Sequence, residues 1–266
     1  MDACIGLWLS RISCVAALRF FKTTLMGNRA KKTGHHQVCT SNAVKMKMSH
    51  SYSNHAERVE AFRRTDVYPV ITTDFCAGRH PIEVARSILE GGATIVQMRE
   101  KSMPDGDFME LLRQARQLTR EYGALLIVDD RVDAALASEA DGVHLGQEDF
   151  PVEDARRLGP ELLIGVSTHN PEEIRKAQAD GCSYLNIGPI FPTKTKQLAC
   201  TFLGLENLRV FSREVTVPFS VMGGIKYDHL PELMACGALH IAAVTAFTQA
   251  ENPAAEVARW RAAMKR

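Results

Sequence analysis

The stretch T-I-V-Q-M-R-E-K, residues 94–101, is a short apolar segment that ends in polar and charged side chains. Alternate residues of a strand face the same side, so Gln97, Arg99 and Lys101 are expected to point together. An amide and two cations at one strand end suit the binding of an anion. Read alone, the segment fits a solvated edge strand with ordinary surface charges equally well. The rest of the chain decides between these two interpretations.

From Asp66 onward, segments of strand character and of helix character alternate to the end of the chain. Each short apolar run is followed by a segment with apolar residues at helical spacing. Two of the helices open with an Asn-Pro pair, an N-cap followed by proline at the first helical position. The expected strands cover residues 68–74, 94–101, 124–128, 142–145, 162–166, 184–190, 218–222 and 240–244.

This alternation identifies the fold class as α/β. Strand–helix units repeated eight times in about 200 residues are typical of a closed (β/α)8 TIM barrel. The alternative is a doubly wound open sheet, which is disfavoured because no G-x-G-x-x-G follows the first strand. We therefore predict one catalytic barrel domain over residues 66–266. In such a barrel the functional groups lie just past the strand ends.

The first part of the chain differs in composition from the barrel. Residues 1–50 contain one acidic residue against eight Lys and Arg, and their apolar patches are too short to span a bilayer. A basic, acid-poor leader is typical of a transit peptide. It also fits upstream sequence read in frame, because Met26, Met46 and Met48 are later potential starts. The poor helical amphipathicity of the leader favours this second interpretation. We expect residues 1–60 to be an unstructured leader or a mis-assigned start.

The overall composition points to an enzyme of small molecules. A formal net charge of +1 gives no field that would recruit nucleic acid or an anionic membrane. The seven cysteines form no C-x-x-C pair, so neither a paired zinc site nor a disulfide framework is indicated. We expect a cytoplasmic protein with no nucleic-acid or membrane partner, and a homo-oligomer stays open.

Carboxylates follow the third and fourth expected strands. Asp129 and Asp130 end the third strand, and Asp149 lies in the loop after the fourth. Oxygen ligands from two adjacent loops suit Mg²⁺, which keeps several waters and binds substrate phosphates. Each aspartate could instead cap the helix that follows it. Beside Arg99 and Lys101, a magnesium and diphosphate site is the preferred interpretation.

Hydroxyl and basic side chains follow the fifth and sixth strands. Ser167 and His169 end the fifth, where His169 fits a loop residue before a helix better than a general base. The loop after the sixth strand resembles a phosphate clamp, although a long loop with stray polar residues would look the same. The polar residues of this clamp are Thr193, Lys194, Thr195 and Lys196.

Bare backbone and a hydroxyl follow the last two strands. Gly224 ends the seventh strand, and Val244 and Thr245 end the eighth. Loops at these positions of a barrel often bind phosphate through backbone N–H groups, although the glycines could merely allow a tight turn. The residues thus describe a magnesium-assisted diphosphate site and a monophosphate site. A reaction that joins a phosphorylated molecule to one losing diphosphate would use both.

Several ordered motifs resemble the thiamine phosphate synthase family over residues 66–266. The resemblance implies condensation of 4-amino-2-methyl-5-hydroxymethylpyrimidine diphosphate with a thiazole phosphate, releasing thiamine phosphate and diphosphate. The motifs are Q-M-R-E-K from residue 97, V-D-D-R-V-D-A-A-L-A from 128, D-G-V-H-L-G-Q-E-D from 141, I-G-V-S-T-H-N from 164, G-P-I-F-P-T-K-T-K from 188 and G-G-I from 223.

The resemblance also implies roles for individual residues. Mg²⁺ would be held by Asp130 and Asp149, and the catalytic cations Arg99, Lys101 and Lys196 would neutralise the leaving diphosphate. The pyrimidine diphosphate would be held by Gln97, Met98, Arg99, Glu100, Lys101, Asp129, Ser167 and Lys196. The thiazole phosphate would be held by Thr193, Thr195, Gly224, Val244 and Thr245.

Two departures and two rival functions accompany the resemblance. The family commonly has Asn at the position of Asp129 and Ser at that of Thr245. A thiazole tautomerase on the same barrel would bind the thiazole phosphate without needing the diphosphate and magnesium residues. A non-catalytic ligand sensor would bind without turnover. The presence of the complete diphosphate and magnesium set favours the synthase.

Overall fold

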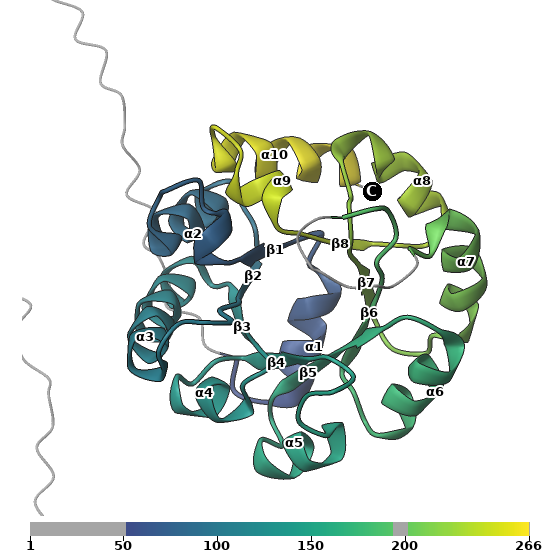
Figure 1. The fold of residues 1–266 in the computed structure, drawn as a ribbon, viewed down its shortest axis with the longest axis horizontal. Coiled ribbons are helices and arrows are strands. Elements are labelled where there is room, and N and C mark those ends of the chain that lie inside the picture. Colours follow the sequence, from purple (N-terminus) through teal and green to yellow (C-terminus); the bar gives the residue numbers. More distant parts are fainter. Residues whose placement is uncertain (1–51, 194–201, 266) are drawn as a thin grey trace, which may run out of the picture. The chain divides into compact units, whose positions relative to one another are not determined.

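A computed structural model describes residues 52–193 and 202–265 of the chain. Eight parallel strands close into a barrel in sequence order, which confirms the predicted TIM barrel (Figure 1). The strands are β1 (Val67–Ile71), β2 (Ile95–Met98), β3 (Leu125–Asp129), β4 (Gly142–Leu145), β5 (Leu163–Thr168), β6 (Tyr184–Ile187), β7 (Phe219–Val221) and β8 (His240–Ala243).

Helices surround the barrel, and one further helix, α1, lies across its ring in the view of Figure 1. The helices are α1 (His55–Arg63), α2 (Pro81–Glu90), α3 (Asp105–Tyr122), α4 (Val132–Ala137), α5 (Val152–Leu158), α6 (Pro171–Ala179), α7 (Gly204–Phe211), α8 (Leu230–Ala235), α9 (Thr245–Thr248) and α10 (Pro253–Met264), with short 3-10 helices η1 (Thr73–Phe75), η2 (Ser212–Glu214) and η3 (Tyr227–His229). Among the described residues, no helix has the length and apolar character needed to cross a membrane.

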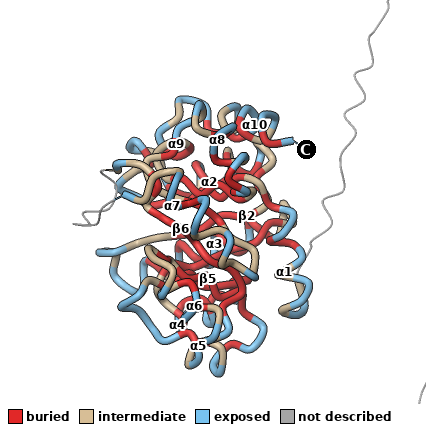
Figure 2. Tube along the Cα trace, turned by 90° about the vertical axis from the view of Figure 1, so that its right-hand side faces the viewer, coloured by how far each residue is buried: buried red, intermediate tan, exposed pale blue. Residues whose placement is uncertain are grey.

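The core has two layers because strand side chains alternate between the barrel interior and the surrounding helices. Val96 and Met98 belong to the large cluster between strands and helices, whereas Ile95 belongs to a smaller cluster inside the barrel. Figure 2 shows the buried residues concentrated in the strands and on the inner faces of the helices. This alternation determines which strand residues face the barrel interior.

Strands β1 and β2 end earlier than expected. Ile71 and Met98 form the last registered pair between β1 and β2, so neither strand continues into the polar residues that follow. After β1, the expected extension to residue 74 is replaced by η1. Arg99 and Lys101 therefore belong to a loop and not to a strand.

The helix α1 covers the N-terminal end of the barrel. Its Phe62 stacks on Tyr184, the first residue of β6, with ring centroids 4.2 Å apart, and lies 4.9 Å from the ring of His240, the first residue of β8. The side chain of Asn54 caps the helix by accepting from Glu57 N–H. The prediction of an unstructured leader through residue 60 is thus wrong for residues 55–60. Only Ala61 and Phe62 are buried in α1, so its sequence lacks an apolar stripe.

Candidate active site

The loop after β2 directs two cations onto one carboxylate. Arg99 Nε lies 3.3 Å from Asp129 Oδ2, and Lys101 Nζ lies 3.2 Å from the same oxygen. Arg99 N–H also donates to the carbonyl of Ile71 at 2.9 Å, which anchors the start of the loop. Gln97, still within β2, lies deeper and is buried inside the barrel. The structure thus brings Arg99 and Lys101 together at the C-terminal end of β2 and β3.

The side chains of Met98 and Glu100 point elsewhere. Met98 is fully buried in the layer between strands and helices, as the alternation of β2 requires. The Glu100 carboxylate accepts hydrogen bonds from Thr73 N–H at 2.8 Å and from the Thr73 hydroxyl at 2.7 Å, which ties it to the loop after β1. Neither side chain joins the cations around Asp129.

Three carboxylates gather at the ends of β3 and β4. Lys101 forms an ion pair with Asp130 as well as with Asp129. Asp130 has a φ of 58°, a left-handed conformation that non-glycine residues rarely adopt and that is common at functional sites. Its N–H donates to the His144 carbonyl of β4 at 2.8 Å, and Asp149 accepts from Gly146 N–H at 2.6 Å. The two loops are therefore fixed by backbone hydrogen bonds beside the cations.

The pKa values of these groups reflect burial first and neighbouring charges second. Burial raises the pKa of Asp129, although Lys101 and Arg99 oppose the rise. Burial raises the pKa of Asp149 too, and a hydrogen bond and repulsion from Asp130 add to the rise. Burial lowers the pKa of Lys101, but the adjacent Asp129 and Asp130 carboxylates more than compensate, so the net pKa is raised. Asp149 therefore interacts with Asp130 across the two loops.

This arrangement fits a cation such as Mg²⁺. Its donors are carboxylate oxygens on two adjacent loops, the ligand type that Mg²⁺ prefers when it keeps several waters. No group of three or more His, Cys, Asp or Glu suited to a metal occurs among residues 52–193 and 202–265. The fit therefore rests on the pair Asp130 and Asp149, whose repulsion a divalent ion would relieve.

Strand β4 and the loop that follows it both contact Ser167 of β5. The Ser167 hydroxyl lies 2.9 Å from Nε2 of His144, and its carbonyl accepts from the Gln147 side chain at 2.5 Å. His169 instead pairs with Glu173 of α6 at 2.8 Å, which agrees with a loop role. The sequence reasoning missed His144 as a site residue. It lies two positions after Gly142 on β4, so both residues face the barrel interior. Gln147 carries no pattern that would have revealed its contact.

The loops after β6 and β7 pack closely at the predicted monophosphate site. Phe191 N–H donates to the Gly223 carbonyl at 2.9 Å. Gly224 has a φ of +63°, and a Cβ there would lie 2.3 Å from the Pro192 carbonyl oxygen, so only glycine fits. Val244 and Thr245 lie at the start of the short helix α9, directly after β8. Thr193 is described, but the predicted residues Lys194, Thr195 and Lys196, which follow it in the loop after β6, lie outside the described residues.

Known proteins of one family resemble this chain. A family model described as thiamine monophosphate synthase matches residues 67–247. The thiamine-phosphate synthase of Moorella thermoacetica is 45% identical over 202 residues, which are 76% of this chain and 96% of the relative. That of Pyrococcus furiosus is 47% identical over 171 residues, 64% of this chain and 82% of the relative.

Solved structures agree with these sequence comparisons. A thiamine phosphate pyrophosphorylase from Pyrococcus furiosus superposes with a TM-score of 0.69 at 39% identity, covering 75% of this chain and 95% of that one. A 3-hexulose-6-phosphate synthase superposes with a TM-score of 0.55 at 19% identity, covering 75% of this chain and 100% of that one. The second likeness reflects the barrel fold alone.

Proposed function

We propose, from the premise that this chain belongs to the thiamine monophosphate synthase family, that it joins the pyrimidine diphosphate to the thiazole phosphate. The products are thiamine phosphate and diphosphate. Support comes from the position of the polar groups, which lie at the C-terminal ends of the strands, where TIM-barrel enzymes carry their active sites.

One observation carries the proposal: two cations and three carboxylates converge after β2, β3 and β4. The cations are Arg99 and Lys101, and the carboxylates are Asp129, Asp130 and Asp149. With all five ionised, the cluster carries one net negative charge and would repel a diphosphate. A bound divalent cation would change the net charge to one positive and make the cluster attractive to that ligand. Magnesium dependence is therefore part of the proposal.

In this mechanism Asp130 and Asp149 hold the magnesium ion, which supplies positive charge to the diphosphate oxygens when bound. Arg99 and Lys101 approach the same end of the substrate. Both are preoriented by Asp129, so little reorganisation is needed when charge develops on the leaving group. Lys196 would add a third cation, as the family resemblance implies.

The bond-forming step needs no general base. The electron-rich aminopyrimidine stabilises a cation at its exocyclic methylene, so departure of diphosphate before attack is chemically reasonable. The thiazole ring nitrogen attacks with its own lone pair and has no proton to lose. The chain's task is to position the two substrates and to neutralise the leaving charge.

The test is the formation of thiamine phosphate and diphosphate from the two purified substrates, with and without Mg²⁺. We expect product that requires the metal, and we expect Asp130→Asn to raise the magnesium concentration needed for half-maximal rate. The exposed Asp133→Asn is a matched control on the neighbouring turn, where Asp133 pairs only with Arg131 among the contacts described. Binding of thiazole phosphate without any product would favour the tautomerase or the sensor instead.

A further inference from the structure

A continuous chain of hydrogen bonds crosses the barrel interior beneath the proposed site. Gln97 Nε2 donates to the Tyr68 hydroxyl at 3.0 Å, and the hydroxyls of Tyr68 and Tyr184 are 2.8 Å apart. The Tyr184 hydroxyl lies 3.1 Å from His144 Nδ1. His144 Nε2 then lies 2.9 Å from the Ser167 hydroxyl. The five residues come from five different strands, and the two end residues, Gln97 and Ser167, are ones that the family resemblance assigns to the pyrimidine diphosphate.

The interior is built to accommodate this chain. Tyr68 and Tyr184 are 1% and 0% exposed, and Gln97 is 2% exposed. Gly165 of β5 provides the room where the chain turns, because a Cβ there would lie 2.3 Å from the Tyr184 hydroxyl and 2.5 Å from His144 Nδ1. Phe62 of α1 stacks on the Tyr184 ring from below. Buried polar groups of this kind are stable only when each has a partner.

With His144 neutral and the Gln97 amide as placed, one set of directions gives every hydrogen in these bonds an acceptor. In that set the Tyr68 oxygen accepts from the Gln97 amide nitrogen, and the Tyr68 hydroxyl donates to Tyr184. The single hydrogen of Tyr184 then goes to His144 Nδ1. That nitrogen is an acceptor, so His144 carries its hydrogen on Nε2 and donates it to Ser167. Burial raises the pKa of both tyrosines, so their hydroxyls stay protonated.

We propose that Tyr68, Tyr184 and His144 are positioning residues that orient Gln97 and Ser167 for the pyrimidine diphosphate. This inference rests on the proposed function. With one N–H engaged by Tyr68, Gln97 keeps its second N–H and its carbonyl oxygen for a ligand. This pair is complementary to the ring nitrogen and the amino group of an aminopyrimidine. Ser167 accepts from His144 and can therefore direct its own hydrogen to the ligand. Without the chain, both side chains would sample several orientations.

The first experiment measures steady-state kinetics of Tyr68→Phe in the full chain. We expect KM for the pyrimidine diphosphate to rise on the order of tenfold, with KM for the thiazole phosphate unchanged. Tyr52→Phe is the matched control. It removes a tyrosine hydroxyl that donates to the Gly123 carbonyl at 3.0 Å and takes no part in the hydrogen bonds between Gln97 and Ser167. Equal changes in both KM values, or a pyrimidine KM equal to that of Tyr52→Phe, would overturn the positioning role.

The second experiment reads the His144 tautomer by ¹⁵N–¹H correlation spectra of histidine-labelled protein, with the signal assigned by its loss in His144→Asn. We expect a hydrogen on Nε2 in the unsubstituted chain and a loss of this preference in Tyr184→Phe. A hydrogen on Nδ1 in the unsubstituted protein would refute the proposed series of hydrogen bonds. If the unsubstituted protein turns over no substrate, the proposed function fails. If it does and Tyr68→Phe behaves as the control, only the positioning role fails.

Discussion

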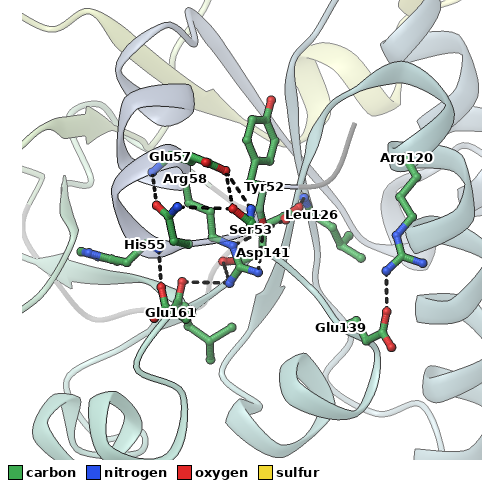
Figure 3. Close-up of polar contacts among 12 residues, drawn as sticks. Tyr52, Ser53, His55, Glu57, Arg58, Arg120, Leu126, Glu139, Asp141 and Glu161 are labelled. Atoms are coloured by element: carbon green, nitrogen blue, oxygen red, sulfur yellow. Dashed lines mark hydrogen bonds and ion pairs between the residues drawn. The ribbon is translucent and has the colours of Figure 1, made fainter. Parts of the chain in front are cut away.

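Replacing Asp141 with Asn should destabilise the fold strongly, although this residue lies remote from the proposed site. The Asp141 side chain is 0% exposed and forms a two-bond ion pair with Arg116, at 2.7 and 3.3 Å. It also accepts from Leu126 N–H at 2.8 Å, and Arg58 of α1 lies 3.9 Å away (Figure 3). The carboxylate therefore joins α1, α3 and β3 through buried contacts.

The expected magnitude follows from what Asn cannot replace. An amide of the same shape has one oxygen and no charge, so the buried Arg116 would keep its positive charge without its ion-pair partner. Breaking a buried ion pair by removing one partner typically costs about 3–5 kcal/mol of unfolding free energy. The loss of the second acceptor oxygen acts in the same direction. We expect the loss in unfolding free energy to fall in this range.

The assay is urea denaturation followed by circular dichroism, with unfolding free energies from linear extrapolation. Glu139→Gln is the matched control, because the pair of Arg120 with Glu139 starts from the same helix, α3, but Glu139 is 73% exposed (Figure 3). Exposed pairs contribute little, so this variant should unfold like the unsubstituted chain. If Asp141→Asn unfolded at the same urea concentration as Glu139→Gln, the reasoning about buried charge would be refuted.

Three further predictions concern the proposed active site. Arg99→Ala should lower kcat by about a hundredfold, measured as diphosphate release, and normal turnover would contradict its role in neutralising the leaving group. The pKa of Asp149 is raised, so its carboxylate protonates at a higher pH than usual, and the Mg²⁺ affinity expected above that pKa should be lost as the pH falls through it. Titrations of the rate against Mg²⁺ at several pH values check this, and an unchanged pH dependence of Mg²⁺ affinity in Asp149→Asn would argue against it. Gly224→Ala would place a methyl 2.3 Å from the Pro192 oxygen at a φ of +63°, so KM for the thiazole phosphate should rise more than that for the pyrimidine diphosphate, and equal KM changes would count against the monophosphate site.

Much of the site could be located from the chain alone. The barrel places every strand end on one face, so Arg99, Lys101, Asp129 and Asp130 were expected to lie together, and the structure brings them together. The expectation did not include the pairing of the cations with Asp129. It also treated Met98 and Glu100 as ligand contacts by their place in the motif, whereas their side chains point away from the cations. A motif fixes neighbours in sequence but not the direction of each side chain.

The helix α1 shows why other parts escaped prediction. Its sequence has no apolar stripe, and its position depends on Phe62 meeting Tyr184, a residue more than a hundred positions further along the chain. The same holds for the contact of Arg58 with Asp141. Such contacts exist only after the barrel has closed, so no local period reports them.

The sequence by itself determined the alternation of strands and helices from Asp66 onward, the barrel, and the polar residues that follow most of its strands. These features depend on local periodicity and on turn chemistry, which short segments carry in full. Only the tertiary structure decided which polar groups pair, such as Gln97 with Tyr68 and Tyr184 with His144. The register and closure of the strands determine those partners, because they bring distant residues within hydrogen-bond distance in the interior of the barrel.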